Sequence, residues 1–246
     1  MKAVVLGGTK GMGRALARLM AERGDALFLL GRDRDDLARS ATDLQIRGAS
    51  GTVGTAHCDL LEPTSFAPAL DAAVAGLGGV DAVVVTAGLS AAQETLEQDA
   101  ALRDRLLTAN FTNTIQFCEL ARQRLLASGG AARLCVFSSV AGDRARKPVL
   151  LYGAAKAGLS YYLTGLDHKF AAQGLKTILV KPGFVKTGMV AGLKPPPFAG
   201  EPEPVARAVL KAIDRGTPVV YAPGIWRWIM LVIKSLPRAV MRRLQF

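Results

Sequence analysis

Cysteine and histidine are both scarce in this chain of 246 residues. The three cysteines, Cys58, Cys118 and Cys135, are odd in number and are never spaced as Cys-x-x-Cys, which excludes a disulfide framework and a cysteine zinc site. The two histidines, His57 and His168, stand in no motif that needs an imidazole, so we expect neither catalysis nor a metal site from them. This cysteine usage suits a reducing, cytoplasmic compartment.

Long apolar runs are also missing. The first residues, MKAVVLGG, are too few for the apolar core of a signal peptide. The longest strongly apolar run, 228–233, is far shorter than the roughly 20 residues that cross a bilayer. We therefore expect neither an export signal nor a membrane-spanning segment.

Acidic side chains are few: 20 aspartates and glutamates face 31 lysines and arginines, for a net charge of +11. The final stretch, WRWIMLVIKSLPRAVMRRLQF, has five basic residues and no acidic one. Such an excess favours an anionic partner. Charge alone leaves a nucleotide, a phosphorylated substrate, a lipid surface and nucleic acid open.

What the chain does contain is a regular alternation of apolar runs and helical patterns. Apolar segments predict seven strands, at 2–8, 26–31, 52–60, 81–88, 132–139, 176–183 and 217–223. Helical patterns are predicted over 11–24, from 33, over 63–77, 98–127 and 152–173, and from 204. Because right-handed crossovers cover both faces of a parallel sheet, we predict an α/β fold with a Rossmann-type, doubly wound sheet of seven parallel strands.

We assign residues 1–224 to this single domain and residues 225–246 to a C-terminal basic and apolar tail. A Pro/Gly-rich stretch, GLKPPPFAGEPEP, follows the sixth predicted strand and is expected to form a flap.

A glycine-rich turn, GGTKGMG, joins the first predicted strand to the first helix. Gly7, Gly11 and Gly13 let the backbone turn tightly and approach a pyrophosphate, whose charge is stabilised by the amides at a helix N-terminus. The strand and helix on either side are the context that a dinucleotide-binding turn requires.

The end of the second predicted strand indicates which nicotinamide nucleotide binds. An acidic residue there would accept a hydrogen bond from the ribose 2′-hydroxyl and repel a 2′-phosphate. This chain has Gly31 followed by Arg32, and Lys10 projects from the glycine turn. Two cations suit a phosphate, so the sequence predicts NADP(H).

A candidate catalytic group follows the fifth predicted strand. Ser139 precedes Tyr152, and Lys156 comes one helical turn after Tyr152. At this i and i+4 spacing the ammonium lies on the same helix face as the phenol, so we expect it to lower the phenol pKa from its usual value of about 10.

These motifs, together with Asn110 in LTANFTN and the segment KPGFVKT, closely resemble the short-chain dehydrogenase/reductase family over nearly the whole chain. The resemblance implies hydride transfer to or from a carbonyl compound by the tetrad Asn110, Ser139, Tyr152 and Lys156. In the reductive direction Tyr152 would act as general acid and Ser139 would polarise the carbonyl oxygen. Lys156 would bind the nicotinamide ribose, and Asn110 would hold a water of the proton relay.

The resemblance also implies a set of cofactor contacts spread along the sequence. It assigns them to Gly7, Thr9, Lys10, Gly11, Met12, Gly13, Arg32, Asp59, Leu60, Ala87, Gly88, Tyr152, Lys156, Pro182, Gly183, Val185 and Thr187. One departure is plain: Val85 and Thr86 stand where the family usually has two asparagines before Ala-Gly.

Within the family, the loop after Ser139 and the basic tail resemble the reductase half of decaprenylphosphoryl-ribose 2′-epimerase, which reduces a 2-keto pentose on a polyprenyl phosphate. Arg144, Arg146 and Lys147 are expected near the mouth of the active site, where cations meet a substrate phosphate. Solvated loop cations are the alternative. Flap residues, Leu193, Pro195, Pro196, Pro197 and Phe198, would cover an apolar substrate or close the cofactor cleft.

Three functions therefore compete: a reductase of a lipid-linked keto sugar, a reductase of small ketones or 3-oxoacyl thioesters, and a non-catalytic NADP-binding sensor. The intact tetrad disfavours the sensor. No nucleic-acid partner is expected, and the family implies a homodimer or homotetramer through the predicted helices at 98–127 and 152–173.

The tail, residues 225–246, is predicted to form two short helices divided at Pro237. Its tryptophans and cations suit a helix at the inner face of a membrane. Packing of Trp226, Trp228, Met230 and Ile233 on the domain or on a partner subunit is the alternative.

Overall fold

The computed structural model describes residues 1–190, 192, 195–196 and 198–245. Within this part of the chain, seven parallel strands form one sheet in the order β3-β2-β1-β4-β5-β6-β7. The strands are β1 (Lys2–Leu6), β2 (Ala26–Gly31), β3 (Gly54–His57), β4 (Ala82–Val85), β5 (Ala132–Phe137), β6 (Leu175–Pro182) and β7 (Val219–Ala222). The predicted Rossmann-type, doubly wound fold is confirmed.

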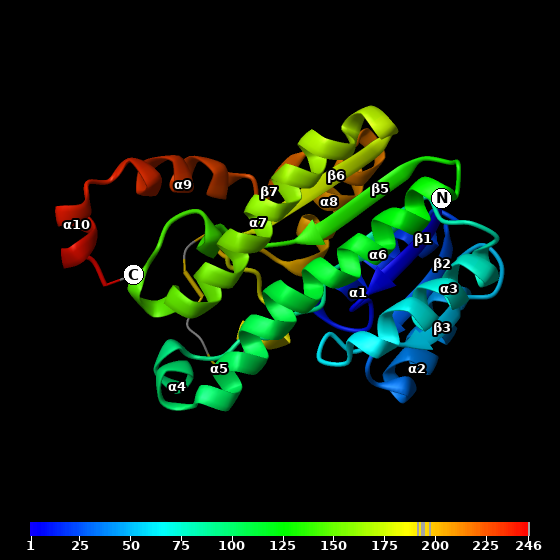
Figure 1. Ribbon diagram of the computed structural model, residues 1–246, viewed down its shortest axis with the longest axis horizontal. Helices are drawn as coiled ribbons and strands as arrows, with labels where there is room; N and C mark the ends of the chain where they lie inside the picture. Colours follow the sequence, from blue (N-terminus) through cyan, green and yellow to red (C-terminus); the bar gives the residue numbers. More distant parts are fainter. Residues whose placement is uncertain (191, 193–194, 197, 246) are drawn as a thin grey trace.

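Helices cover both faces of the sheet (Figure 1). One face carries α1 (Gly11–Glu22), α2 (Arg34–Ile46) and α8 (Pro202–Arg215), and the other carries α3 (Phe66–Leu77), α6 (Asn113–Ala127) and α7 (Leu150–Phe170). Alternate residues of a strand point to opposite faces, so Val4 and Leu6 pack in one core and Ala3 and Val5 in the other. The central strands are buried on both faces, which explains their unbroken apolar runs.

Several boundaries differ from the sequence prediction. The third strand is shorter, because only Gly54–His57 pairs with β2 as a regular strand. The helix from Pro63 begins as a single 3₁₀ turn, and α8 starts at Pro202 rather than at Pro204. A short helix, α4 (Gln93–Gln98), was not predicted.

The long helix predicted over 98–127 is not continuous. Asp99 caps α5 (Ala100–Leu107), and its carboxylate accepts a hydrogen bond from the Leu102 amide at 2.9 Å. A π-helical turn, Thr108–Thr112, then separates α5 from α6. Such turns are frequent at functional sites, and this one contains Asn110.

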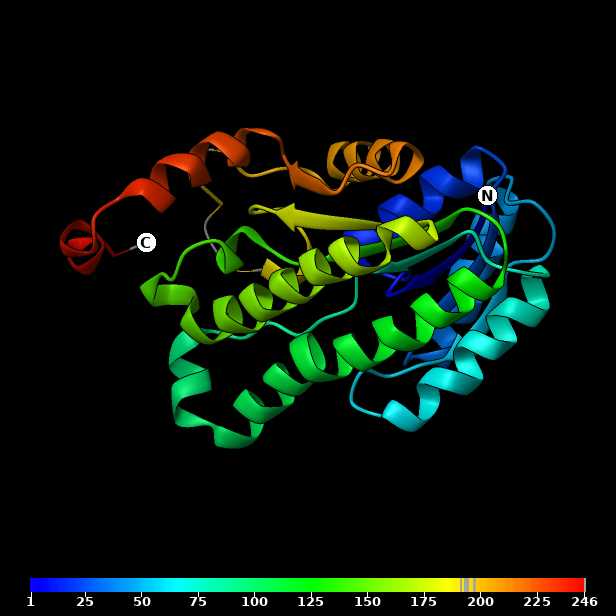
Figure 2. The same ribbon diagram turned by 45° about the horizontal axis from the view of Figure 1, so that its top comes forward.

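The tail forms two helices, α9 (Ile225–Ser235) and α10 (Arg238–Arg243), with Pro237 between them as predicted. Figures 1 and 2 both place them beyond the carboxyl end of the sheet, beside the segment that leads into α7. Trp226 and Met230 are buried against Val140 of the domain. None of the helices in the described ranges is both long and apolar enough to cross a membrane.

Truncating Met230, which is 0% exposed, is expected to loosen the tail. Met230→Ala removes a buried contact worth about 2 kcal/mol or more, which is about a 30-fold rise in the detached population. Trypsin cleavage at Arg227, Lys234 and Arg238 would then accelerate while the domain stays intact. Leu231→Ala, at a position 59% exposed, is the matched control; equal cleavage of both variants would contradict a docked tail.

Candidate active site

A cavity of about 510 Å³ opens at the carboxyl ends of β1, β2 and β4. It lies where the strand order reverses between β1 and β4, the position at which doubly wound sheets bind ligands. Nine predicted cofactor residues that precede the third helix line it: Gly7, Thr9, Lys10, Gly11, Met12, Gly13, Arg32, Asp59 and Leu60. Three predicted residues from later in the chain, Ala87, Gly88 and Thr187, complete this lining.

The glycine turn has the shape of a cradle. Gly7 and Gly11 have φ angles of 89° and 53°, which glycine adopts without strain. A Cβ on Gly13 would collide with the carbonyl oxygen of Gly7 and the hydroxyl of Thr86. The first residues of α1, Gly11, Met12 and Gly13, line the cavity, and among the described residues no side chain caps this end of the helix. This arrangement fits a pyrophosphate.

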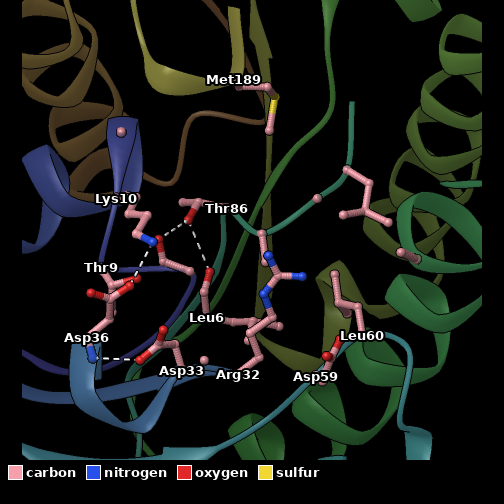
Figure 3. Close-up of a pocket in the computed structure, with 18 of the residues that line it drawn as sticks. Leu6, Thr9, Lys10, Arg32, Asp33, Asp36, Asp59, Leu60, Thr86 and Met189 are labelled. Carbon is pink, nitrogen blue, oxygen red and sulfur yellow. Dashed lines mark hydrogen bonds and ion pairs between the residues drawn. The ribbon is translucent and has the colours of Figure 1, made fainter. Parts of the chain in front are cut away.

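The charges around the second strand are more balanced than the sequence suggests. Lys10 forms an ion pair of 2.7 Å with Asp36, and the Asp33 carboxylate accepts a hydrogen bond from the Asp36 amide. Figure 3 shows Arg32 reaching into the cavity between the Lys10–Asp36 pair and the side that carries Asp59. Of the two cations predicted to bind the 2′-phosphate, Lys10 is paired with a carboxylate, and Arg32 faces the cavity.

Thr86, which stands where the family usually has an asparagine, bonds to the first strand and the glycine turn. Its hydroxyl oxygen lies 3.1 Å from the Leu6 carbonyl oxygen and 3.0 Å from that of Gly7, and it donates to them (Figure 3). These bonds join the end of β4 to the glycine turn. The sequence analysis recorded Thr86 only as a departure from the family pattern. Its hydroxyl, directly after the buried strand β4, was the feature that could have indicated these hydrogen bonds.

Asn110 is fully buried and bonds to one residue at both ends of its amide. Its oxygen accepts from the Leu89 amide at 2.7 Å, and its nitrogen donates to the Leu89 carbonyl at 2.7 Å. A Cβ on Gly88 would lie 2.9 Å from the Asn110 oxygen and 3.8 Å from the Lys156 nitrogen. The segment that lines the cavity thus passes directly against two members of the predicted tetrad.

Close backbone packing brings Ser139 to Tyr152. A Cβ on Gly142 would lie 2.7 Å from the Ala157 nitrogen, and one on Gly153 would lie 2.8 Å from the Ala141 carbonyl oxygen. Because both positions lack a side chain, the turn after Ser139 can lie on α7. The Ser139 hydroxyl consequently forms a hydrogen bond with the Tyr152 phenol.

Burial controls the acidity of the phenol. It raises the pKa of Tyr152 to about 12, although the hydrogen bond from Ser139 acts in the opposite direction. The expectation that Lys156 lowers this pKa is wrong for the protein in this state. Lys156 donates to the Phe137 carbonyl at 2.9 Å instead, and burial lowers the pKa of Lys156 to about 8.

The predicted nicotinamide segment has only one residue at the cavity. Pro182 ends β6, Gly183 packs beneath the indole of Trp226, and Val185 is 4% exposed. Thr187 alone lines the cavity, where its methyl group would lie 3.4 Å from a Cβ on Gly11.

The chain before the flap and the chain at its end lie side by side, because Val185 and Gly200 form an isolated parallel bridge. The carbonyl of Phe198 accepts a hydrogen bond from the Trp226 indole at 3.2 Å, which ties the flap to the tail. Of the flap residues named above, Leu193 and Pro197 lie outside the described residues.

The tail also binds the basic loop that follows Ser139. Arg144 donates to the Leu236 carbonyl at 2.9 Å, and Lys147 donates to the Arg242 carbonyl at 2.9 Å. The sequence placed all three loop cations at the active-site mouth, but two of them meet carbonyls of the tail. Contacts between segments more than 90 residues apart leave no local signal in the sequence.

Comparison with known proteins decides the family. A model for the short chain dehydrogenases matches residues 1–197. The chain belongs to this family. The match ends before α8, β7 and the tail.

Relatives of this short-chain dehydrogenase cover nearly its full length. An uncharacterized oxidoreductase of Mycobacterium tuberculosis is 33% identical, over 98% of this chain and 96% of its own. Carbonyl reductase family member 4 of Danio rerio is 30% identical, over 86% and 90%. A short-chain dehydrogenase from Sphingobium yanoikuyae, solved in complex with NADPH, shares the fold with a TM-score of 0.81 at 24% identity, over 97% and 98%. The protein is an oxidoreductase.

Proposed function

We propose that this oxidoreductase is an NADP(H)-dependent carbonyl reductase in which Tyr152 protonates the carbonyl oxygen. The carrying observation is the group formed by half-buried Ser139 and Tyr152 and buried Lys156, beside the Gly88 end of the cavity. A phenol whose ordinary pKa is about 10 is protonated at neutral pH, and burial of Tyr152 does not change this, so Tyr152 has the form that a general acid needs. The name of the Danio rerio relative supports this reaction class.

The cavity fits a nicotinamide dinucleotide. Glycines leave room for the pyrophosphate at the start of α1, and we assign Asp59 and Leu60 to the adenine and the segment 182–187 to the nicotinamide. When bound, this nucleotide supplies the hydride that reduces the carbonyl carbon.

The residues of the chain then have distinct tasks. Ser139 holds the phenol of Tyr152 through its hydrogen bond and orients the carbonyl oxygen toward it. Lys156, with a pKa of about 8, remains mostly charged at pH 7 and holds the ribose. Asn110 fixes the Leu89 segment through two hydrogen bonds, and we retain its proposed role in a water-mediated proton relay.

Replacing Tyr152 by phenylalanine removes the proton donor and leaves the ring. We expect Tyr152→Phe to lower ketone reduction about 100-fold or more, with NADPH binding close to that of the wild type. Steady-state NADPH oxidation and fluorescence titration measure the two effects. Tyr161→Phe, at a position 85% exposed, is the matched control. Unchanged turnover in Tyr152→Phe would remove the catalytic assignment.

We propose NADP(H) rather than NAD(H) because the cavity presents the cation of Arg32, while the two nearby carboxylates, Asp33 and Asp36, already have partners. Gly31 ends the second strand, Asp33 caps α2, and Asp36 is paired with Lys10. Arg32 is exposed at the cavity and is suited to a phosphate. The NADPH complex of the Sphingobium yanoikuyae protein supports the same choice.

Arg32→Met is expected to weaken NADPH binding about tenfold or more, the effect of losing a charge-assisted hydrogen bond, and to leave NADH binding unchanged. Arg34→Met, which removes an exposed charge two residues away, should alter neither affinity. Calorimetric titration of both nucleotides checks this. A wild-type protein that binds NADH as tightly as NADPH would contradict the proposed preference.

For the substrate, we propose a 2-keto sugar on a polyprenyl phosphate, supported by the basic loop and the tail that adjoin Ser139. Small ketones or 3-oxoacyl thioesters are the second candidate, supported by the carbonyl reductase relative. A screen of all three substrate types with purified enzyme decides between them; equal or better turnover of the simple compounds excludes the first.

We further propose that the tail contacts an anionic membrane surface from the cytoplasmic side. Ile225, Trp228, Leu231 and Val232 lie on one side of α9 and are 45–61% exposed. Cations of α9 and α10 flank them, and each adds about 1 kcal/mol of attraction near anionic lipid. Interfacial helices have this combination of apolar and basic surfaces.

Vesicle sedimentation tests the contact. The wild type is expected to sediment with phosphatidylcholine vesicles only when they contain phosphatidylglycerol. Replacing Trp228 and Leu231 together by alanine should reduce the bound fraction about tenfold, since it exposes far less apolar area to the bilayer. Sedimentation equal to that of the wild type would contradict membrane contact.

A homodimer or homotetramer through α6 and α7 also remains our proposal. The family to which the chain belongs supports this proposal.

A further inference from the structure

The loop between Ser139 and Tyr152 carries three cations, and the tail satisfies two of them. Arg144 bonds to the carbonyl of Leu236, directly after α9, and Lys147 bonds to the carbonyl of Arg242 near the end of α10. Lys147 also donates to the side chain of Gln245 at 3.2 Å. Carbonyls at helix C-termini carry partial negative charge, so these contacts are electrostatically favourable. Arg144 and Lys147 therefore hold the tail.

Arg146 lies between these two cations and differs from both. Its side chain is half-buried, and its Nε is buried without a hydrogen-bond partner among the described residues. Burial lowers the pKa of Arg146, although an arginine stays charged at neutral pH. A buried donor left unsatisfied costs about 1–3 kcal/mol, more when it is charged. The loop between Ser139 and Tyr152 thus holds a charged side chain with one unsatisfied donor.

The carboxylate that acts on Arg146 does not satisfy it. Asp143 attracts the guanidinium through space, but one of its oxygens accepts from Lys181 at 2.5 Å and the other from Tyr221 at 2.7 Å. No acidic residue follows Asp214 in the sequence, so the tail contributes none. Arg146 therefore has two further cations, Arg144 and Lys147, on its own loop, and its Nε–H lacks an acceptor among the described residues.

We propose that Arg146 binds a phosphate group of the carbonyl substrate. A guanidinium donates two parallel hydrogen bonds to a phosphate, a geometry that a lysine ammonium cannot reproduce. Arg146 is seven residues after Ser139 and six before Tyr152, so its loop begins and ends at the proposed catalytic side chains. This inference rests on the proposed carbonyl reductase function and names the residue that selects its substrate.

The tail supports this role by fixing the loop. With Arg144 and Lys147 bound to the tail, and Asp143 bound to β6 and β7, the backbone on both sides of Arg146 is held. A pre-positioned guanidinium loses less conformational entropy when it binds its ligand. The monoester phosphate of a free keto sugar and the phosphodiester of a lipid-linked keto sugar both present at least two non-bridging oxygens to it.

Kinetics with matched ketones test the proposal at saturating NADPH. Ribulose 5-phosphate and ribulose are keto-pentoses with and without a phosphate, and a keto-pentose on a short polyprenyl phosphate is the third substrate. We expect Arg146→Met to lower kcat/KM for the phosphorylated ketones at least tenfold, through KM, and to leave that for ribulose unchanged. Arg146→Lys should retain part of the preference. The phosphorylated ketone with the larger wild-type kcat/KM identifies the source of the phosphate.

Arg215→Met is the charge-matched control. Arg215 is exposed at the end of α8, on the side of the sheet where β7 begins, and its loss should affect no substrate. An equal fall for ribulose and ribulose 5-phosphate in Arg146→Met, or no fall for either phosphorylated ketone, would overturn the proposal.

Binding separates this inference from the proposed function. In the Tyr152→Phe background, where turnover is expected to be blocked, calorimetry with ribulose 5-phosphate should show an affinity that Arg146→Met reduces at least tenfold. Failure of the wild type to reduce any ketone would refute the carbonyl reductase, whereas binding that is indifferent to Arg146 would refute the phosphate subsite. Circular dichroism establishes that each variant is folded.

Discussion

The ammonium group of Lys156 is a charge held in the interior, 5% exposed, and much of the proposed active site is arranged around it. A buried cation is tolerated only where hydrogen bonds replace water. Here the Phe137 carbonyl at the end of β5 accepts from it, and the Lys156 carbonyl in turn accepts from Ser138. These bonds hold α7 against the carboxyl end of β5. Tyr152, one turn earlier on α7, is thereby placed beside Ser139.

Glycines, which have no side chain, are as important to the site as its polar residues. Gly142 and Gly153 allow the Ser139 turn to lie directly on α7, and Gly13 allows the glycine turn to approach Thr86. Gly88 allows the β4 segment to pass next to Asn110 and Lys156. Each position would place a Cβ within 3 Å of a neighbouring atom. The cavity and the predicted tetrad are joined because backbone segments meet without side chains between them.

The tail adds a second layer to this arrangement, beyond the region that the family model matches. Trp226 covers Gly183 and bonds to the flap at Phe198, while the tail carbonyls bind Arg144 and Lys147. The tail therefore touches the flap, the proposed nicotinamide segment and the loop before Tyr152 at once. The outer side of α9 remains apolar and exposed. The tail thus contacts the loop proposed to bind the substrate, and its outer side is the surface proposed to contact a membrane.

The sequence by itself determined the fold class, the glycine turn and the Tyr152 and Lys156 pair, because these show in short stretches: apolar runs closed by glycines predict the strands, and i to i+4 spacing places two side chains on one helix face. The resemblance to the family added Ser139. Only the tertiary structure decided which charges are satisfied. Lys10 meets Asp36, Arg144 meets Leu236, and the phenol of Tyr152 is raised rather than lowered in pKa by its burial. Charge pairing and desolvation depend on which distant segments surround a group, and the spacing of neighbouring residues in the sequence cannot predict those segments.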